Sequence, residues 1–150
     1  MIARLSLILL VVAGIAAPVN AETLSTPAAL AEQTREFMEK AAEGEINAAY
    51  RGIRPFLGVP VDAFDASADE ASVYFSKVRD KAGKTLDYAR VRHEAIADDF
   101  HRVVWLQKFA AAAIAWTFTF YQPEDGWKLV GVSYSTTIDD LYQTVRSPGQ

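Results

Sequence analysis

The chain contains no cysteine, and this absence excludes several classes of protein at once. It can have neither a disulfide scaffold nor a lipid anchor attached through an N-terminal cysteine. Positive charge is also scarce, because 15 Lys and Arg residues are outnumbered by 19 Asp and Glu residues and the formal net charge is −4. Nucleic acids are bound through a basic surface, so this balance argues against a nucleic-acid partner.

Motifs for catalysis and metal binding are missing as well. The sequence has no Gly-x-Ser-x-Gly motif for a nucleophilic serine and no glycine-rich phosphate loop. Its two histidines, His93 and His101, form no recognised metal-ligand spacing, even with Glu94 or Asp98 as a third ligand. We therefore expect no cofactor and no metal site.

Long hydrophobic runs are limited to one, near the N-terminus. Arg4 precedes a hydrophobic segment from Leu5 to Ala17, and Val19-Asn20-Ala21 offers small residues to a signal peptidase. This segment is shorter than the roughly 20 residues that span a bilayer. Residues 1–21 are therefore predicted to be a cleaved signal peptide, with an uncleaved membrane anchor as the alternative. Residues 22–150 would then form one domain with no membrane anchor, periplasmic or secreted if the host is a bacterium.

Helical periodicity marks the first half of residues 22–150. Thr26 and Pro27 are typical of a helix start, and Gly44 is expected to end that first helix. A second helix should run from Ile46 to just before Pro55, followed by a loop over residues 56–61, and a third from about Asp65 to Lys81. The positions expected to face inward are Leu30, Thr34, Phe37, Met38, Ala41, Ile46, Ala49, Tyr50, Ile53, Ala68, Ala71, Phe75 and Val78.

After Gly83 the hydrophobic pattern changes to the period of two that is typical of strands. We predict strands over residues 86–96 and 101–109, joined by a turn at Asp98-Asp99. Residues 114–135 contain two more, joined by the turn Pro123-Glu124-Asp125-Gly126. The four alanines at residues 110–113 favour helix by propensity, but a turn there aligns the aromatic residues of the neighbouring strands. The order of elements predicts an α+β fold in which three helices cover one face of a four-stranded antiparallel sheet.

The expected register gathers the large apolar side chains on one face of this sheet. A turn at Ala111-Ala112 places Trp105 opposite Phe118. In the last two strands, the expected register pairs Tyr121 with Trp127. The other pairs expected to face each other are Gln107 with Trp116, Phe120 with Lys128, Phe118 with Val130, Trp116 with Val132, and Ile114 with Tyr134.

Four short motifs carry a family resemblance. They are Gly44-Glu45-x-x-x-Ala49-Tyr50, Gly83-x-x-Leu86-x-Tyr88, Trp116-x-Phe118-x-Phe120-Tyr121 and Asp125-Gly126-Trp127-x-Leu129. Together they resemble the nuclear transport factor 2-like superfamily, the cystatin-like cone fold, and in particular its uncharacterised exported bacterial members. The resemblance implies a cone-shaped roll with a curved sheet. This fold hosts many unrelated activities, so it specifies function poorly.

The resemblance also implies a cavity between the helices and the curved sheet. The residues expected to line it are Tyr50, Arg54, Tyr74, His93, Trp105, Gln107, Trp116 and Phe118. The competing interpretation is that the aromatic residues simply fill the core. An isomerase or hydrolyase would need acid and base groups inside a dry cavity, for which Tyr50, Tyr74, Asp87 and His93 are candidates, although no catalytic motif of such an enzyme can be matched.

Two surfaces leave alternatives open. On the first strand, the set containing Arg90 and Arg92 is expected to point to solvent; if it pointed inward, it would favour an anionic ligand. The outer face of the sheet is expected to carry small hydroxyl groups with two aromatic residues, a composition that suits an interface or a homodimer. The candidate interface residues are Thr117, Thr119, Tyr121, Trp127 and Ser133.

These observations lead to one functional hypothesis and one alternative. We expect an exported, non-catalytic domain that binds a small-molecule ligand or a protein partner. The alternative is a small cone-fold enzyme of the isomerase or hydrolyase type. A filled cone with an exposed aromatic patch would favour binding, and a deep cavity with an acid or base of shifted pKa would favour the enzyme.

Overall fold

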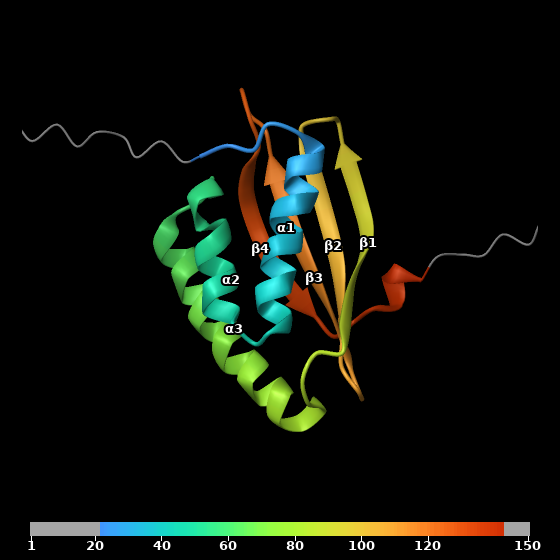
Figure 1. The fold of residues 1–150 in the computed structure, drawn as a ribbon. Helices are drawn as coiled ribbons and strands as arrows, with labels where there is room; N and C mark the ends of the chain where they lie inside the picture. Colours follow the sequence, from blue (N-terminus) through green and yellow to red (C-terminus); the bar gives the residue numbers. More distant parts are fainter. Residues whose placement is uncertain (1–21, 143–150) are drawn as a thin grey trace, which may run out of the picture.

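The computed structural model describes residues 22–142, so the predicted signal peptide lies outside the described residues, as do residues 143–150. Three helices are followed by four strands, as the sequence predicts (Figure 1). The elements are α1 (Pro27–Ala42), α2 (Ile46–Ile53), η1 (Arg54–Phe56), α3 (Val61–Ala82), β1 (Asp87–Ile96), β2 (Phe100–Lys108), β3 (Ala113–Tyr121), β4 (Lys128–Ser135) and η2 (Asp139–Leu141). Among residues 22–142, none of the helices is long and apolar enough to cross a membrane.

The helix boundaries follow the capping residues in the sequence. The Thr26 side chain accepts a hydrogen bond from the Ala29 amide at 3.1 Å, and Pro27 begins α1. Gly44 has φ +86°, a left-handed conformation that suits glycine and reverses the chain between α1 and α2. The third helix begins four residues earlier than expected because Phe64, which is buried, extends its apolar stripe by one turn.

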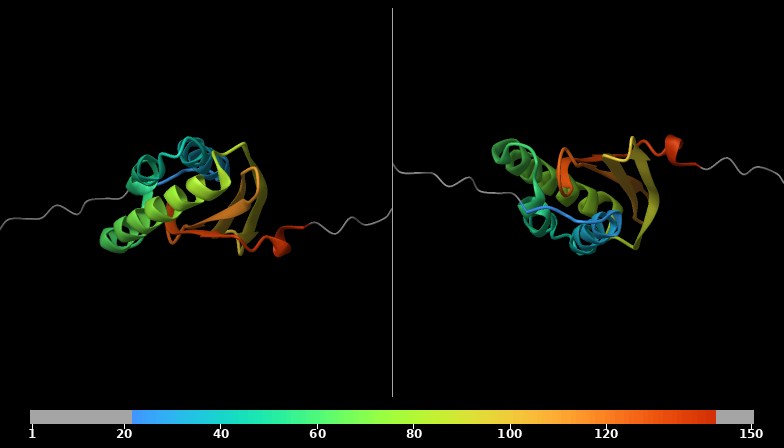
Figure 2. Two further views of the ribbon diagram at one scale, coloured as in Figure 1. Left: turned by 90° about the horizontal axis from the view of Figure 1, so that it is seen from below. Right: turned by 90° about the horizontal axis from the view of Figure 1, so that it is seen from above.

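The four strands form one antiparallel sheet in the order β1-β2-β3-β4, and the helices cover one of its faces. Figure 2 shows the sheet curving around the helical layer, with α3 crossing it diagonally. After β4 the chain crosses the opposite, outer face toward β1, where the Arg92 guanidinium donates a hydrogen bond to the Asp140 carbonyl. Val104 and Ala115 on the outer face are buried under this C-terminal segment.

Trp116 is the centre of the core between the helices and the sheet. Its ring stacks on Phe75 of α3 at a centroid distance of 4.7 Å and meets Phe37 of α1 edge to face at 5.1 Å. Phe118 also meets Phe37, at 4.9 Å. Burial of each large side chain contributes roughly 1.5–3 kcal/mol, so this aromatic group is a main source of the hydrophobic driving force.

The predicted register between β2 and β3 is wrong by two residues. Trp105 lies opposite Trp116 rather than Phe118, and Gln107 lies opposite Ile114 rather than Trp116. The turn is one residue earlier than expected, at residues 110–111, because the Phe109 amide donates to the Ala112 carbonyl at 2.8 Å. A shift of two residues keeps each side chain on its predicted face, so the aromatic face survives the error.

The predicted register between β3 and β4 is wrong by one residue beside the turn, where Tyr121 pairs with Lys128 rather than Trp127, and by two residues beyond a bulge in β4. Phe120 pairs with Leu129 and Thr119 with Gly131, which leaves Val130 as the extra residue. Leu129 is therefore buried in the core instead of lying on the outer face. Beyond the bulge, Phe118 pairs with Val132 and Trp116 with Tyr134.

Trp127 is also misplaced by the sequence analysis, because it is buried among the core residues. Its amide donates to the Leu24 carbonyl at 2.7 Å, and its carbonyl accepts from the Leu24 amide at 3.0 Å. The N-terminal segment therefore covers Trp127, and this residue does not belong to the outer-face interface.

A second bulge, at Val91, divides the side chains of β1 between the two faces. Arg90 pairs with Trp105 but Arg92 pairs with Val104, so the two arginines lie on opposite sides of the sheet. Neither alternative drawn from the sequence is therefore right for the whole strand. Tyr88 joins Arg90 on the helix side and packs near Trp105 at a centroid distance of 5.9 Å.

Candidate functional site

The space between α2 and the sheet, where the sequence analysis expects a cavity, is filled by side chains. Tyr50 of α2 is buried and meets Phe37 at 5.2 Å and Trp116 at 6.4 Å between ring centroids. Phe64 closes the other side of Tyr50, also at 5.2 Å. The aromatic residues therefore form a packed core at this place, with no room for a ligand.

The predicted cavity residues separate into a buried group and a surface group. The buried ones are Tyr50, Trp105, Gln107, Trp116 and Phe118. Arg54 lies at the surface, where its guanidinium binds the Asp65 carboxylate at 2.9 and 3.0 Å and lowers the pKa of that carboxyl. Tyr74 stacks on Tyr134 at 5.0 Å, half-buried, and His93 lies exposed on β1. The structure thus brings the predicted set together at no single site.

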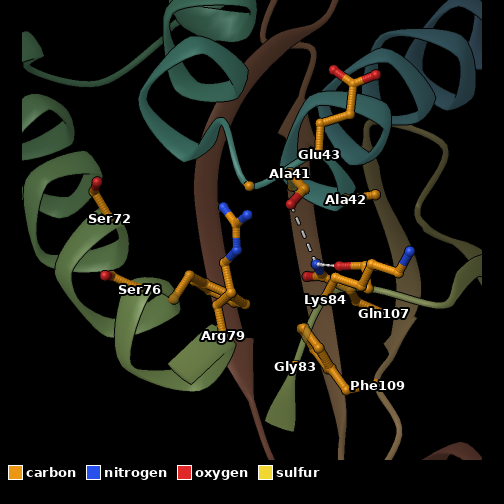
Figure 3. Close-up of a pocket in the computed structure, with 13 residues that line it drawn as sticks. Ala41, Ala42, Glu43, Ser72, Ser76, Arg79, Gly83, Lys84, Gln107 and Phe109 are labelled. Atoms are coloured by element: carbon orange, nitrogen blue, oxygen red, sulfur yellow. Dashed lines mark hydrogen bonds between the residues drawn. The ribbon is translucent and has the colours of Figure 1, made fainter. Parts of the chain in front are cut away.

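An open pocket does exist at the end of the sheet where β1 begins and β2 ends. Its volume is about 430 Å³, within the range of small-molecule sites. Figure 3 shows the residues that line it, contributed by the end of α1, by α3, by the connection to β1 and by β2. They are Ala41, Ala42, Glu43, Gly44, Ser72, Phe75, Ser76, Arg79, Gly83, Lys84, Thr85, Gln107 and Phe109. We call this cavity the arginine pocket.

Positive charge predominates in the arginine pocket. Arg79 projects from α3 toward the α1–α2 connection, and a β-carbon added at Gly44 would lie 3.1 Å from its Nη1 atom. Within residues 22–142 Arg79 forms no ion pair. Lys84 adds a second cation, and Figure 3 shows the Glu43 carboxylate pointing away from Arg79. The guanidinium therefore keeps its donors available for an anion.

The chemistry of the wall is supplied by hydroxyl groups and rings. Ser72 and Ser76 precede Arg79 on the same face of α3, at helical spacing, so their hydroxyls lie along one side of the pocket. Phe75 and Phe109 supply apolar surface. A ligand with an anionic head and an apolar body would match this lining.

Gln107 forms part of the wall but is fully occupied by internal hydrogen bonds. Its Oε1 accepts from Trp116 Nε1 at 2.8 Å. Its Nε2 donates to Thr85 Oγ1 at 2.7 Å and to the Ala41 carbonyl at 3.4 Å. This buried side chain therefore joins β2, β3, α1 and the connection to β1, and its role is structural.

Acid and base groups suited to catalysis are not assembled in this pocket. Among its lining residues Glu43 is the one carboxylate, and histidine is absent. The strongest perturbation of a tyrosine lies elsewhere, since burial, followed by the nearby Tyr134, raises the pKa of Tyr50. A neutral, buried phenol without a neighbouring base belongs to the core rather than to a catalytic pair.

The outer face of the sheet carries an aromatic patch at the β1–β2 hairpin. Phe100 stacks on Tyr121 at 4.4 Å with an interplanar angle of 16°, and Ile96 is 73% exposed. Thr119 lines a groove beside them, together with the Arg102–Glu94 ion pair. Of the predicted interface residues, Thr117, Thr119, Tyr121 and Ser133 are on this face.

Sequence reasoning missed the residues that define the arginine pocket. Ser72, Ser76, Arg79 and Gly83 recur at helical spacing, but such a polar stripe is usually a solvated helix face. In the sequence Gly83 marked only the change of hydrophobic pattern and the start of one family motif. The signal available was that this polar stripe adjoins the buried Phe75, so that it borders the core at one end.

Comparisons with protein-family models, with curated proteins and with solved structures find no match to this chain.

Proposed function

We propose that this chain is an exported, non-catalytic binding domain whose ligand is a small anionic molecule held in the arginine pocket. The observation that carries the proposal is the Arg79 guanidinium, which adjoins an open cavity and has no acidic partner within residues 22–142. A planar guanidinium binds a carboxylate or phosphate through two parallel hydrogen bonds.

The other groups of the pocket support the same class of ligand. Lys84 attracts the anion, and the Ser72 and Ser76 hydroxyls can donate to its oxygens. Phe75 and Phe109 offer contact to an apolar body, which distinguishes an organic anion from an inorganic one. Ser72, Phe75 and Ser76 lie on α3, which packs on the core through Phe75.

Export and family membership remain parts of this proposal that rest on the sequence. The leader over residues 1–21 has the pattern of a signal peptide. Four motifs resemble those of the nuclear transport factor 2-like superfamily. The order of elements, three helices before an antiparallel curved sheet, supports the same proposal. The enzyme alternative has less support, because the space that would hold its acid and base is filled by Tyr50 and Trp116.

The proposal can be tested with anilinonaphthalene sulfonate, a fluorescent probe that carries an anionic head on an aromatic body. We expect the protein to bind the probe and Arg79→Gln to weaken binding at least tenfold. Lys81→Gln, on the same helix but outside the pocket, is the matched control because it removes one positive charge. Competition by aromatic carboxylates and by inorganic phosphate would then separate organic from inorganic anions. Equal probe binding by the protein and by Arg79→Gln would contradict the proposal.

A second candidate function is self-association through the aromatic patch of Ile96, Phe100 and Tyr121. Phe100 is 39% exposed although it stacks on Tyr121, and Ile96 lies beside it. Aromatic residues of this kind are common at the centre of interfaces.

Light scattering after gel filtration tests this candidate. We expect a dimer that Phe100→Ser dissociates, whereas Val73→Ser, which removes an exposed apolar side chain from α3, leaves it intact. A protein that stays monomeric at high concentration would contradict self-association through this patch.

A further inference from the structure

The two histidines of the chain meet on the helix side of the sheet, at the end opposite the arginine pocket. His93 lies in β1 and His101 in β2. Their Nε2 and Nδ1 atoms form a hydrogen bond at 2.9 Å, and the ring centroids are 5.1 Å apart with an interplanar angle of 72°. The sequence contains no other histidine, so the fold has brought both imidazoles together.

The surrounding strands hold this pair in place. His93 pairs with Val103 and His101 with Ala95, which makes the two histidines diagonal neighbours on adjacent antiparallel strands. Trp127 packs edge to face on His101 at 4.4 Å and is itself tied to Leu24 by two backbone hydrogen bonds. The His101 ring is thereby fixed, while His93, on the edge strand, is open to solvent.

The separation of the two nitrogens is also compatible with a chelated metal ion that replaces the hydrogen bond between the rings. Imidazole nitrogens bind Zn²⁺ at about 2.0–2.1 Å, so two of them lie about 2.9 Å apart at a ligand–metal–ligand angle of 90° and about 3.3 Å apart at a tetrahedral angle. We propose that His93 and His101 form a two-histidine binding site for a divalent transition-metal ion such as Zn²⁺, Ni²⁺ or Cu²⁺. This proposal is independent of the arginine pocket.

The charges around the pair set the expected strength of the site. His93 is exposed and His101 is half-buried, so an ion can reach the pair from solvent. Arg90 lies on the same face and repels a cation. Within residues 22–142, no group of three or more His, Cys, Asp or Glu side chains converges. Water or an added ligand would fill the remaining positions, so we expect modest affinity.

The test is a titration of untagged protein, residues 22–150, with Zn²⁺ and with Ni²⁺. Binding is measured by calorimetry and by the shifts of the imidazole signals in NMR spectra. Copper is avoided in this experiment because a free N-terminal amine also binds it. We expect one ion per chain, with both histidines perturbed together. His93→Gln and His101→Gln should each weaken binding at least tenfold, because each leaves a single imidazole.

Two further variants make the result specific. Glu94→Gln is the matched control, since Glu94 lies on the outer face with Arg102 and should leave the affinity unchanged. Arg90→Gln should strengthen binding by removing the nearby positive charge. His93 is exposed, so its substitution should preserve the fold even if His101→Gln disturbs Trp127. Binding that is equally strong in the protein and in His93→Gln would overturn the proposal, as would the absence of binding at millimolar Zn²⁺.

Discussion

Replacing Thr34 with valine should destabilise the fold by removing one buried hydrogen bond between α1 and β2. Thr34 and Trp105 are both buried, and Trp105 Nε1 donates to Thr34 Oγ1 at 2.8 Å. The hydroxyl in turn donates to the Ala31 carbonyl at 2.9 Å. Valine keeps the shape of threonine but offers no acceptor, so the indole N–H would be left unpaired in the core.

The size of this effect follows from what each lost contact costs. An unsatisfied buried donor costs about 1–3 kcal/mol. The Ala31 carbonyl loses little, because it is at the same time an acceptor within the helix. The added methyl group offsets part of the loss through burial, at about 0.8 kcal/mol. We therefore expect a net loss of about 0.2–2.2 kcal/mol, which corresponds to a fall in Tm of up to roughly 8 °C for a domain of this size.

A double-mutant cycle separates the hydrogen bond from changes in packing. Urea unfolding, followed by tryptophan fluorescence and circular dichroism, would be measured for the unaltered protein, Thr34→Val, Trp105→Phe and the double variant. Phenylalanine removes the donor, so Thr34→Val should cost little in the Trp105→Phe background. Thr34→Ser keeps the hydroxyl and reports the loss of the methyl group alone.

The reasoning would be refuted by additive behaviour. If the coupling between the two substitutions is below about 0.3–0.5 kcal/mol, the usual limit for independent sites, the hydrogen bond makes no contribution of the expected size. A Thr34→Val variant more stable than the unaltered protein would lead to the same conclusion.

Three other substitutions, one of them with a matched control, test the turn, the core and the buried phenol. Gly126→Ala should lower the free energy of unfolding, measured in urea, by about 2 kcal/mol or more, because Gly126 has φ +78° and a β-carbon there would lie 2.5 Å from the Thr23 side chain. Gly131→Ala is the control: its β-carbon would meet its nearest atom at 3.9 Å, so its free energy of unfolding should change by less than about 1 kcal/mol. Phe75→Leu should cost roughly 1–2 kcal/mol by thermal unfolding, since it removes the ring stacked on Trp116 at 4.7 Å. Tyr50→Phe should reduce the loss of folding stability above pH 10. The pKa of Tyr50 is raised in the folded state, so the unfolded chain loses its phenol proton first and stability declines as pH rises. An unchanged dependence of stability on pH in the variant would show that Tyr50 does not cause this decline.

Much of the fold could be predicted because its signals are local. Thr26 with Pro27 and the left-handed Gly44 define the ends of α1 by capping and backbone geometry. The inward stripe of α2, from Ile46 to Ile53, is a pattern of side chains at helical spacing. Each of these signals is read within a few residues, so no long-range information is needed.

Strand pairing was predicted less well because it depends on contacts between distant residues. The turn of the β2–β3 hairpin was placed one residue late, which shifts the register by two and leaves Trp105 and Trp116 on the correct face. Beside the turn, β4 is shifted by one residue, and this odd shift moves Leu129 from the outer face to the core. The bulge at Val130 adds a second residue, so Val132 and Tyr134 keep their predicted face. Alternation alone cannot reveal a bulge, because Leu129 and Val130 are both apolar and fit either face.

The candidate site was harder still to predict, because the expected cavity was inferred from the resemblance. The aromatic residues assigned to it, among them Tyr50 and Trp116, are large enough to fill the space themselves. The pocket lies instead where α1 and α3 end and β1 begins, so its lining comes from short segments far apart in the chain. Arg79 acquires its position from tertiary packing, and the one sign of it within α3 is that the polar stripe adjoins the buried Phe75.

The bulge at Val91 explains how one edge strand contributes to two different environments. Without it, Ala89 and Val91 would share the helix side with His93, and Tyr88 would lie on the outer face. With it, the Tyr88 ring packs near Trp105 toward the pocket end, while His93 still meets His101 at the other end. Burial of a tyrosine ring in place of an alanine methyl group favours the bulged pairing by the larger apolar area removed from water. The same shift brings Arg90 to the side of the histidines, where its charge limits the affinity of the proposed metal site.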